Sequence, residues 1–275
     1  MKIRLITTTP ILFLCLLSCK DHKQNQKEKI EVKTQTDQNI ADSEKIEKHW
    51  SYEGETGPEH WAEIEKDSDC QGSDQSPINI IDKDVNYASD LKPLEIHYAP
   101  STKIHDVINN GHSIQYNFEQ GDYITYDGVK YDLKQIHFHE ASEHTINGVR
   151  YPMEMHMVHT NAKNEYAVLA VMAEEGEGSE PFNFLEKYLP LNQGEEKTVD
   201  ASFDLNLNFP SNKKYYYYKG SLTTPPCTEG VNWFVYKTPI TISLEQVKAL
   251  QKLMPLNNYR TERPLNNRVV QTNSK

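Results

Sequence analysis

The chain has no surplus of positive charge. Its 275 residues include 29 Lys and Arg against 40 Asp and Glu, which gives a formal net charge of −11. A protein that binds nucleic acid through its phosphates needs a basic face that displaces counterions. The composition therefore excludes a nucleic-acid partner and indicates a soluble acidic surface. Internal repeats are also absent, so we expect residues 50–275 to form one large domain.

Long apolar runs are missing, apart from one at the N-terminus. Residues 5–17 are largely apolar and follow two basic residues, the pattern of an export signal, and they are too few to span a bilayer comfortably. The run ends Leu-Leu-Ser-Cys, which resembles a bacterial lipobox with cleavage after Ser18 and lipid on Cys19. The alternative is an ordinary secretory signal with a chance cysteine.

The lipobox interpretation predicts a signal peptide over residues 1–18 and a membrane anchor at Cys19. The mature protein would then be exported and held on the periplasmic or cell-surface side of a bacterial membrane. Lys20, in place of aspartate, favours the outer membrane. Residues 20–49 contain no aromatic side chain and few aliphatic ones, so they cannot bury enough apolar surface to offset the entropy of ordering. We expect residues 19–49 to form the lipidated cysteine and a flexible tether.

Cysteine is scarce. Of the four cysteines, Cys15 lies in the signal and Cys19 at the lipidation site, so Cys70 and Cys227 are the two thiols left. Export places them in an oxidising compartment, and we expect them to form a disulfide. Two free thiols are the alternative.

Helix signals are few, and strand signals dominate residues 50–275. The predicted helices are 243–254, which begins with a capping box of Ser243 and Gln246, and 181–188. The predicted strands are runs of alternating or β-branched residues, namely 94–98, 113–118, 123–126, 129–133, 135–139, 153–159, 166–173, 215–219 and 231–236.

Three histidines occur with strand spacing between Gln135 and His159. His137 and His139 are two residues apart, as are Glu154 and His156, and side chains two apart on a strand share a face. We therefore expect a polar face with three converging imidazoles and an apolar face that packs in a core. Three imidazoles without thiolate or carboxylate ligands suit zinc, and they leave a fourth position open for chemistry. The alternative is a set of solvated polar side chains.

The residues beside the histidines support a metal site. Gln135 and Glu154 each lie two positions from a histidine, on the same face, where they can accept an imidazole N–H and fix its tautomer.

Several longer motifs give the chain a family resemblance. It resembles an alpha-class carbonic anhydrase of the bacterial, exported type. The resemblance covers residues 50–275 and is carried by WSYEGETGPEHW at 50–61, QSPINI at 75–80, NNGHS at 109–113, QIHFHEASEHTINGVRYPMEMHMVH at 135–159, GSLTTPPCTEGVNWFVY at 220–236 and RPLNNR at 263–268.

The resemblance implies a mainly β, single-domain fold, with a twisted and mostly antiparallel sheet of about ten strands and a few short helices. It implies reversible hydration of carbon dioxide to bicarbonate and a proton, by attack of a zinc-bound hydroxide. His137, His139 and His156 would hold Zn²⁺. Whether the domain is a monomer or a homodimer stays open.

The resemblance also assigns roles around the metal. Thr223 would orient the nucleophile by donating to Glu143, and His112 would carry the proton to solvent. The predicted positions that order cavity water are Tyr52, Asn110 and Gln115, although Gln115 is asparagine in vertebrate relatives. The predicted substrate pocket consists of Val158, Val168, Leu222, Val231, Trp233 and Thr224.

The chain departs from the family pattern at Glu140 and Ala141, directly after the HFH motif, where strand curvature beside the metal can differ. Two rival functions remain: a zinc-dependent esterase, and a non-catalytic surface module for adhesion or glycan binding. The esterase would need a large substrate-recognition insert, and none is apparent. The surface module is disfavoured by the intact zinc ligands, Glu143 and Thr223.

Overall fold

The fold is mostly β. The computed structural model describes residues 49–189 and 191–274. The predicted signal peptide, Cys19 and nearly all of the tether lie outside the described residues. None of the helices within the described ranges has both the length and the apolar character needed to cross a membrane.

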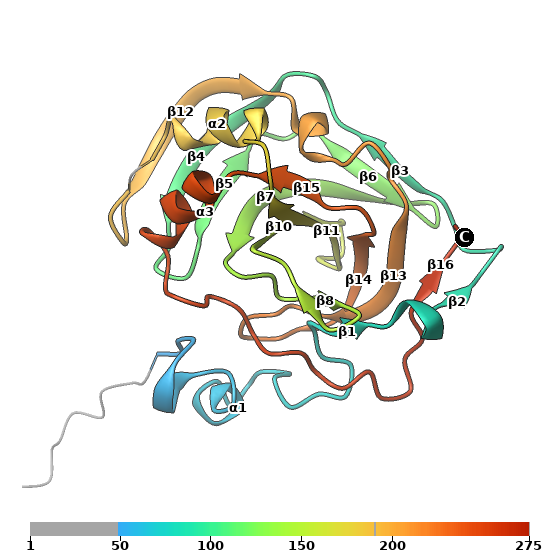
Figure 1. The fold of residues 1–275 in the computed structure, drawn as a ribbon. Coiled ribbons are helices and arrows are strands. Elements are labelled where there is room, and N and C mark those ends of the chain that lie inside the picture. The colour runs from blue at the N-terminus through green and yellow to red at the C-terminus, as the bar shows by residue number, and fades with distance from the viewer. Residues whose placement is uncertain (1–48, 190, 275) are drawn as a thin grey trace, which may run out of the picture. The chain divides into compact units, whose positions relative to one another are not determined.

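One 13-stranded sheet dominates the domain, and a path of consecutively paired strands runs through it (Figure 1). Three further strands lie off this path. Strand β6 pairs with β7, β3 pairs with β6, and β15 pairs with β11. In order along the path the strands are β12 (Glu196–Phe203), β4 (Thr102–Asn109), β5 (Ile114–Phe118), β7 (Val129–His139), β10 (Met153–Thr160), β11 (Tyr166–Glu175), β14 (Glu229–Tyr236), β13 (Tyr215–Ser221), β16 (Gln271–Thr272) and β2 (Asn86–Tyr87). Off the path are β3 (Leu94–His97), β6 (Tyr123–Tyr126) and β15 (Ile240–Ile242).

Most of the strand pairs are antiparallel, as expected, but β11 is parallel to both β14 and β15. A second, three-stranded sheet contains β1 (Asn79–Ile80), β8 (Thr145–Ile146) and β9 (Val149–Arg150). The helices are short: α1 (Trp61–Ile64), α2 (Glu180–Glu186) and α3 (Leu244–Gln251), with 3-10 turns at Gly54–Thr56, Asp82–Asp84 and Leu205–Asn208.

The two predicted helices exist and pack on each other (Figure 1). The capping box of α3 is confirmed, because the Gln246 backbone N–H donates to Ser243 Oγ at 3.3 Å and the Ser243 N–H donates to Gln246 Oε1 at 3.1 Å. Gln246 also donates to Asn183 Oδ1 of α2 at 2.6 Å. One side chain therefore caps α3 and also joins it to α2. Helix α3 ends at Gln251, three residues earlier than predicted.

The strand predictions need two corrections. The runs 129–133 and 135–139 form a single strand, β7, in which the register with β10 shifts at Lys134, a β-bulge between Leu133 and Gln135. Strands β4 and β12, which pair with each other, were not predicted, and neither were the short strands β1, β2, β8, β9, β15 and β16. Strand β12 is mostly exposed and carries charged residues, and β4 turns the carboxylate of Asp106 inward, so neither shows a clear apolar alternation.

The central strands are buried on both faces. In β10 every residue except Thr160 is buried. Met153, Met155 and Met157 pack in the large core cluster, as expected, while Val158 packs in a second cluster on the other side. The face that carries the histidines is therefore not a solvated polar face, and its polar groups must find partners inside the protein.

Cys70 and Cys227 form a disulfide across 157 residues, which confirms the predicted pairing and excludes two free thiols. The bridge packs with the fully buried Trp61 of α1 and with Tyr52. It joins the N-terminal part of the domain to the loop after β13, where Thr223 lies.

Candidate metal centre and active site

Three histidines converge where β7 and β10 pair. His137 lies directly opposite His156 in the register, and His139 lies opposite Glu154. One ring nitrogen from each histidine lies within 4.8 Å of those of the other two. The structure thus brings together the three predicted ligands, and the side chains project from rigid central strands.

The tautomer of each ring is set by an acceptor on its outer side. His137 Nδ1 donates to Gln135 Oε1 at 2.9 Å, and His156 Nε2 donates to Glu154 Oε1 at 2.7 Å. His139 Nδ1 donates to the backbone oxygen of Asn258 at 2.7 Å. The other nitrogen of each neutral ring must therefore carry a lone pair.

The inner nitrogens fit a metal ion. His139 Nε2 is buried and has no hydrogen-bond partner among the described residues, which is costly unless something else binds it. Burial lowers the pKa of His137 well below its usual value, and the adjacent His139 and His156 lower that pKa further. Burial likewise lowers the pKa of His139. Three neutral imidazoles with free lone pairs are the donor set that zinc prefers.

Glu154 is the most heavily bonded group of the site. It is fully buried, and its Oε2 accepts the backbone N–H groups of Glu143 and His144, both at 2.8 Å. Its Oε1 accepts from His156 and from His144 Nδ1, both at 2.7 Å. Burial alone would raise the pKa of Glu154, but His144 and His156 outweigh burial and hold it well below its usual value.

His144, Glu154 and His156 also lie close enough together to suggest a second metal group. Here the ring nitrogens are already used, because His144 Nε2 contacts the Tyr218 hydroxyl at 2.6 Å and His144 Nδ1 donates to Glu154. This group is therefore a completed hydrogen-bond network, and it needs no ion.

Glu143 and Thr223 are both buried, but they are not hydrogen-bonded to each other in the described part of the chain. Glu143 Oε1 accepts the backbone N–H of Arg260 at 2.9 Å. Among the described residues Glu143 Oε2 has no hydrogen-bond partner, and it lies 3.4 Å from His139 Nε2. Glu143 Oε2, which lacks a donor among the described residues, therefore lies beside the ring nitrogen of His139 that also lacks a partner.

A family model described as eukaryotic-type carbonic anhydrase matches residues 56–274. The chain belongs to the carbonic anhydrase family. A carbonic anhydrase of Klebsiella pneumoniae is 44% identical over 228 residues, which cover 81% of this chain and 90% of the relative. A carbonic anhydrase of Neisseria gonorrhoeae is 40% identical over 225 residues and is covered to 87%, again against 81% of this chain.

Solved structures of alpha-carbonic anhydrases have the same fold. The enzyme of Thermovibrio ammonificans, in complex with the inhibitor sulfanilamide, superposes with a TM-score of 0.77 at 40% identity, covering 81% of this chain and 98% of that one. The enzyme of Photobacterium profundum gives a TM-score of 0.75 at 39% identity, with 81% and 100% covered. The expected family, fold and enzyme class are therefore confirmed.

The predicted carbon dioxide pocket is a continuous apolar cluster in this carbonic anhydrase. Val158, Val168, Val231 and Trp233 belong to one buried cluster, and Leu222 packs against it. The Trp233 ring lies 4.9 Å from the His156 ring, centroid to centroid, so the apolar wall reaches a predicted metal ligand. Thr224 lies in the turn after β13, where its backbone oxygen accepts the Cys227 backbone N–H at 2.8 Å.

His112 lines a surface pocket together with His49, Trp50, Tyr52 and Asn110. Its ring stacks on Trp50 at 3.7 Å, and its Nε2 lies 3.2 Å from His49 Nε2. Burial lowers the pKa of His112, and the nearby His49 lowers it further. The ring therefore releases a proton more readily than a free histidine does.

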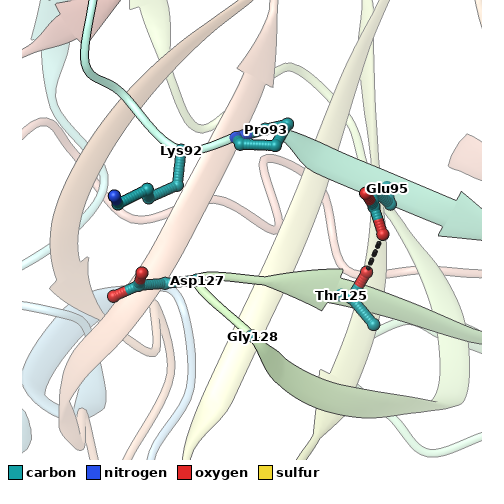
Figure 2. A pocket seen from close by; sticks show the side chains of 6 residues that line it. All are labelled: Lys92, Pro93, Glu95, Thr125, Asp127 and Gly128. Atoms are coloured by element: carbon teal, nitrogen blue, oxygen red, sulfur yellow. Dashed lines mark hydrogen bonds between the residues drawn. The ribbon is translucent and has the colours of Figure 1, made fainter.

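A separate surface hollow lies at the β3–β6 edge and shares no residue with the metal centre. Figure 2 shows its lining side chains and the bond that Thr125 Oγ1 donates to Glu95 Oε2 at 2.7 Å; they are Lys92, Pro93, Glu95, Thr125, Asp127 and Gly128. We assign it no role in the family reaction.

Several residues of the site were not predicted from the sequence. His144 follows Glu143 directly, and its hydrogen-bond partner Glu154 lies 10 residues further along the chain. Asn258 acts through its backbone oxygen, and its side chain also accepts the Glu140 N–H at 2.7 Å. Arg260 is fully buried and donates to Gln75 Oε1 at 2.7 Å. No motif in the sequence points to these two contacts.

Proposed function

We propose that the protein catalyses the zinc-dependent, reversible hydration of carbon dioxide to bicarbonate and a proton. The observation that carries this proposal is the orientation of His137, His139 and His156. Each ring donates outward to a fixed acceptor, so three lone pairs remain for one ion. Zinc held there would supply a strong nucleophile near neutral pH by lowering the pKa of water, an effect for which carbonic anhydrases are the reference case.

The chain's own residues prepare the ligands and the substrate. Gln135, Glu154 and the Asn258 oxygen hold the rings neutral and correctly turned. Carbon dioxide is small and apolar, and the wall around Val158 and Trp233 excludes water from one side of the centre. That wall is the feature we assign to substrate binding.

Thr223 and Glu143 orient the reaction. Glu143 Oε2 is a buried acceptor without a donor among the described residues, and we assign the Thr223 hydroxyl as its donor. A carboxylate only accepts, so the threonine lone pairs would stay available to the attacking group. The Thr223 N–H can meet a substrate oxygen as negative charge develops.

Proton export is assigned to His112. Its lowered pKa and half-buried place in a surface pocket support a role in passing the proton to solvent and buffer. Tyr52, Asn110 and Gln115 line or adjoin this route and are assigned to ordering water.

Stopped-flow hydration of carbon dioxide tests the proposal. We expect activity in zinc-loaded protein, loss after removal of the metal with a chelator, recovery on adding zinc, and inhibition by sulfanilamide. Hydration no faster than in buffer alone would exclude the function. In that case, retained ester hydrolysis would favour the esterase, and bound zinc without either activity would favour the surface module.

We also propose export and lipid anchoring through Cys19. The signal-like residues 1–18 and the lipobox-like end support this. Cell fractionation should find the protein with membranes, and a Cys19→Ala variant should lose that association. If the wild-type chain is found in the soluble fraction, this part of the proposal is wrong, and the reaction chemistry is unaffected.

A further inference from the structure

A row of polar side chains crosses two strands from a buried carboxylate to the loop that carries His112. Asp106 on β4 lies opposite Asn117 on β5. Gln115, two residues earlier on β5, lies opposite His137. Residues two apart on a strand share a face, so the row runs beside a metal ligand and ends at Asn110, just after β4.

Each member donates to the next toward Asp106. Asn117 Nδ2 donates to Asp106 Oδ1 at 2.6 Å, and Gln115 Nε2 donates to Asn117 Oδ1 at 2.7 Å. Asn110 Nδ2 lies 3.4 Å from Gln115 Oε1, the longest step. Asn110 Oδ1 accepts the backbone N–H groups of His112 at 2.9 Å and Ser113 at 2.8 Å.

The groups at the two ends of the row fix the same donor-to-acceptor direction for the hydrogen bonds between them. A side-chain amide can turn over and exchange its donor for its acceptor, so the direction of such a row is not fixed by shape alone. The Asp106 carboxylate can only accept, and the backbone N–H groups at the other end can only donate. With both ends present, one arrangement of the three amides satisfies every bond.

Asp106 is an unusual residue in this place. It is only 5% exposed, and no lysine or arginine in the described ranges forms an ion pair with it. Its other contact is the exposed His105 on the same strand. Its hydrogen bonds with Asn117 and His105 offset the cost of burying the carboxylate, and a carboxylate at this end of the row can only accept.

We propose that Asp106 is a positioning residue for proton export. It fixes the direction of the Asn117 and Gln115 amides, so that Gln115 presents its oxygen to Asn110, and Asn110 in turn holds the backbone of the His112 loop. The inference rests on the proposed function, because it takes His112 as the group that exports the proton. Asp106 itself touches neither the substrate nor the metal ligands.

Without the carboxylate the amides are free to turn over. Gln115 would then present its NH₂ to the NH₂ of Asn110 part of the time, and two donors repel. The His112 loop would lose a fixed support, while His137, His139 and His156 keep their own acceptors. Proton export should therefore slow, and hydration at the metal should not.

The test compares Asp106→Leu with Asp106→Asn. In dilute buffer we expect Asp106→Leu to lower kcat about three-fold, the size of effect typical of residues that act through a network. kcat/KM should stay unchanged, and added imidazole buffer should restore kcat. Asp106→Asn should behave like the wild type, because its oxygen can still accept from Asn117 in the direction that the Asn110 end imposes.

Asp122→Leu is a matched control. Asp122 is also a buried aspartate, 4% exposed, and it accepts from the Ala99 N–H and from Thr102 rather than from the amide row. We expect this variant to lose thermal stability and to keep the wild-type kcat in dilute buffer.

Three results would overturn the inference. They are a wild-type kcat in Asp106→Leu, the same loss of kcat in Asp122→Leu, and a loss that imidazole does not restore. If Asp106→Leu does not fold, Asn117→Leu breaks the same row at a less buried position, and an unchanged kcat there overturns the inference equally.

Side-chain amide NMR gives a readout that is independent of turnover. The NH₂ protons of Gln115 and Asn117 should exchange slowly in the wild type and in Asp106→Asn, and fast in Asp106→Leu. Fast exchange in the wild type would contradict the fixed direction. A wild-type protein without any hydration activity would instead exclude the proposed function and leave the NMR result interpretable.

Discussion

Two regions of the site, here called the floor and the rim, differ in the elements that carry them and in the partners of their side chains. The floor, made of His137, His139, His156 and their acceptors, projects from two paired central strands. The rim, made of His49, Trp50, Tyr52, Asn110 and His112, comes from the N-terminal segment and the loop after β4. In the floor every outer ring nitrogen has a fixed acceptor, whereas at the rim His112 contacts a stacked ring and another histidine.

The difference matches the two proposed tasks, metal binding and proton export, which need different surroundings. A metal ligand must stay neutral and immobile, and burial with acceptor-only partners provides both. A proton carrier must change its charge during each turnover, and it needs contact with solvent. Changes in the floor should therefore abolish the reaction, while changes at the rim should only slow it.

The largest effect should follow from removing a ligand. We expect His139→Ala to lose zinc and to reduce carbon dioxide hydration to the level of buffer alone, because two imidazoles do not hold the ion. Metal analysis and stopped-flow hydration measure this. His97→Ala, which removes an exposed histidine stacked on Tyr123, is the control and should keep both. Full zinc content in the His139→Ala protein would show that His139 is not required to bind the metal, and it would contradict the proposed difference between floor and rim.

A smaller loss should follow in the layer behind the ligands. Glu154→Gln replaces one oxygen with an NH₂ group that must face two of the four donors, which are His144, His156 and two backbone N–H groups. Removing such a partner typically costs about 10- to 100-fold in metal affinity or activity, and we expect zinc affinity to fall in that range.

Competition with a chelator measures the affinity of the Glu154→Gln protein for zinc. The control is Glu262→Gln, which loses only a partly exposed pair with Arg150. Equal zinc affinity in the two variants would show that the buried network does not hold His156.

The floor could be predicted from the sequence because strand spacing alone places its side chains. The two-residue steps from Gln135 to His137 and from Glu154 to His156 fix which side chains share a face, and the structure has those contacts. The third acceptor could not be predicted. It is a backbone oxygen at Asn258, 119 residues from His139, and a backbone group leaves no mark on the residue type.

The rest of the fold shows the same limit. Strands were predicted where apolar alternation is strong, as in β10 and β14, and they were missed where polar residues turn inward, as Asp106 does in β4. At the rim, the resemblance identified His112, but the spacing of residues could not show that Trp50 stacks on it or that His49 contacts it. Such contacts join segments 62 residues or more apart, and only tertiary structure brings them together.

At the rim, His112→Ala should slow turnover without affecting the metal. Proton transfer by a positioned side chain contributes typically a factor of about a hundred or more, and because water and buffer reach the half-open rim we expect a loss of roughly ten-fold in dilute buffer. kcat/KM and zinc content should not change, and imidazole should restore kcat. A loss of zinc, or an unchanged kcat in dilute buffer, would contradict the export role.

The smallest effect should come from His49, whose ring contacts His112 and lies beside Trp50. Burial lowers the pKa of His112, and the nearby His49 lowers it further, because two positive charges 3.2 Å apart repel each other. His49→Ala should therefore raise the pKa of His112 toward its usual value. The acid limb of the kcat profile in dilute buffer should then move to higher pH, since His112 stays protonated over a wider range. NMR titration of the His112 ring measures the same shift directly. His60→Ala, at an exposed histidine beside Glu63, should shift neither. A His112 pKa that falls, or stays where it is, would show that His49 does not tune the proton carrier, and the rim would then act through His112 alone.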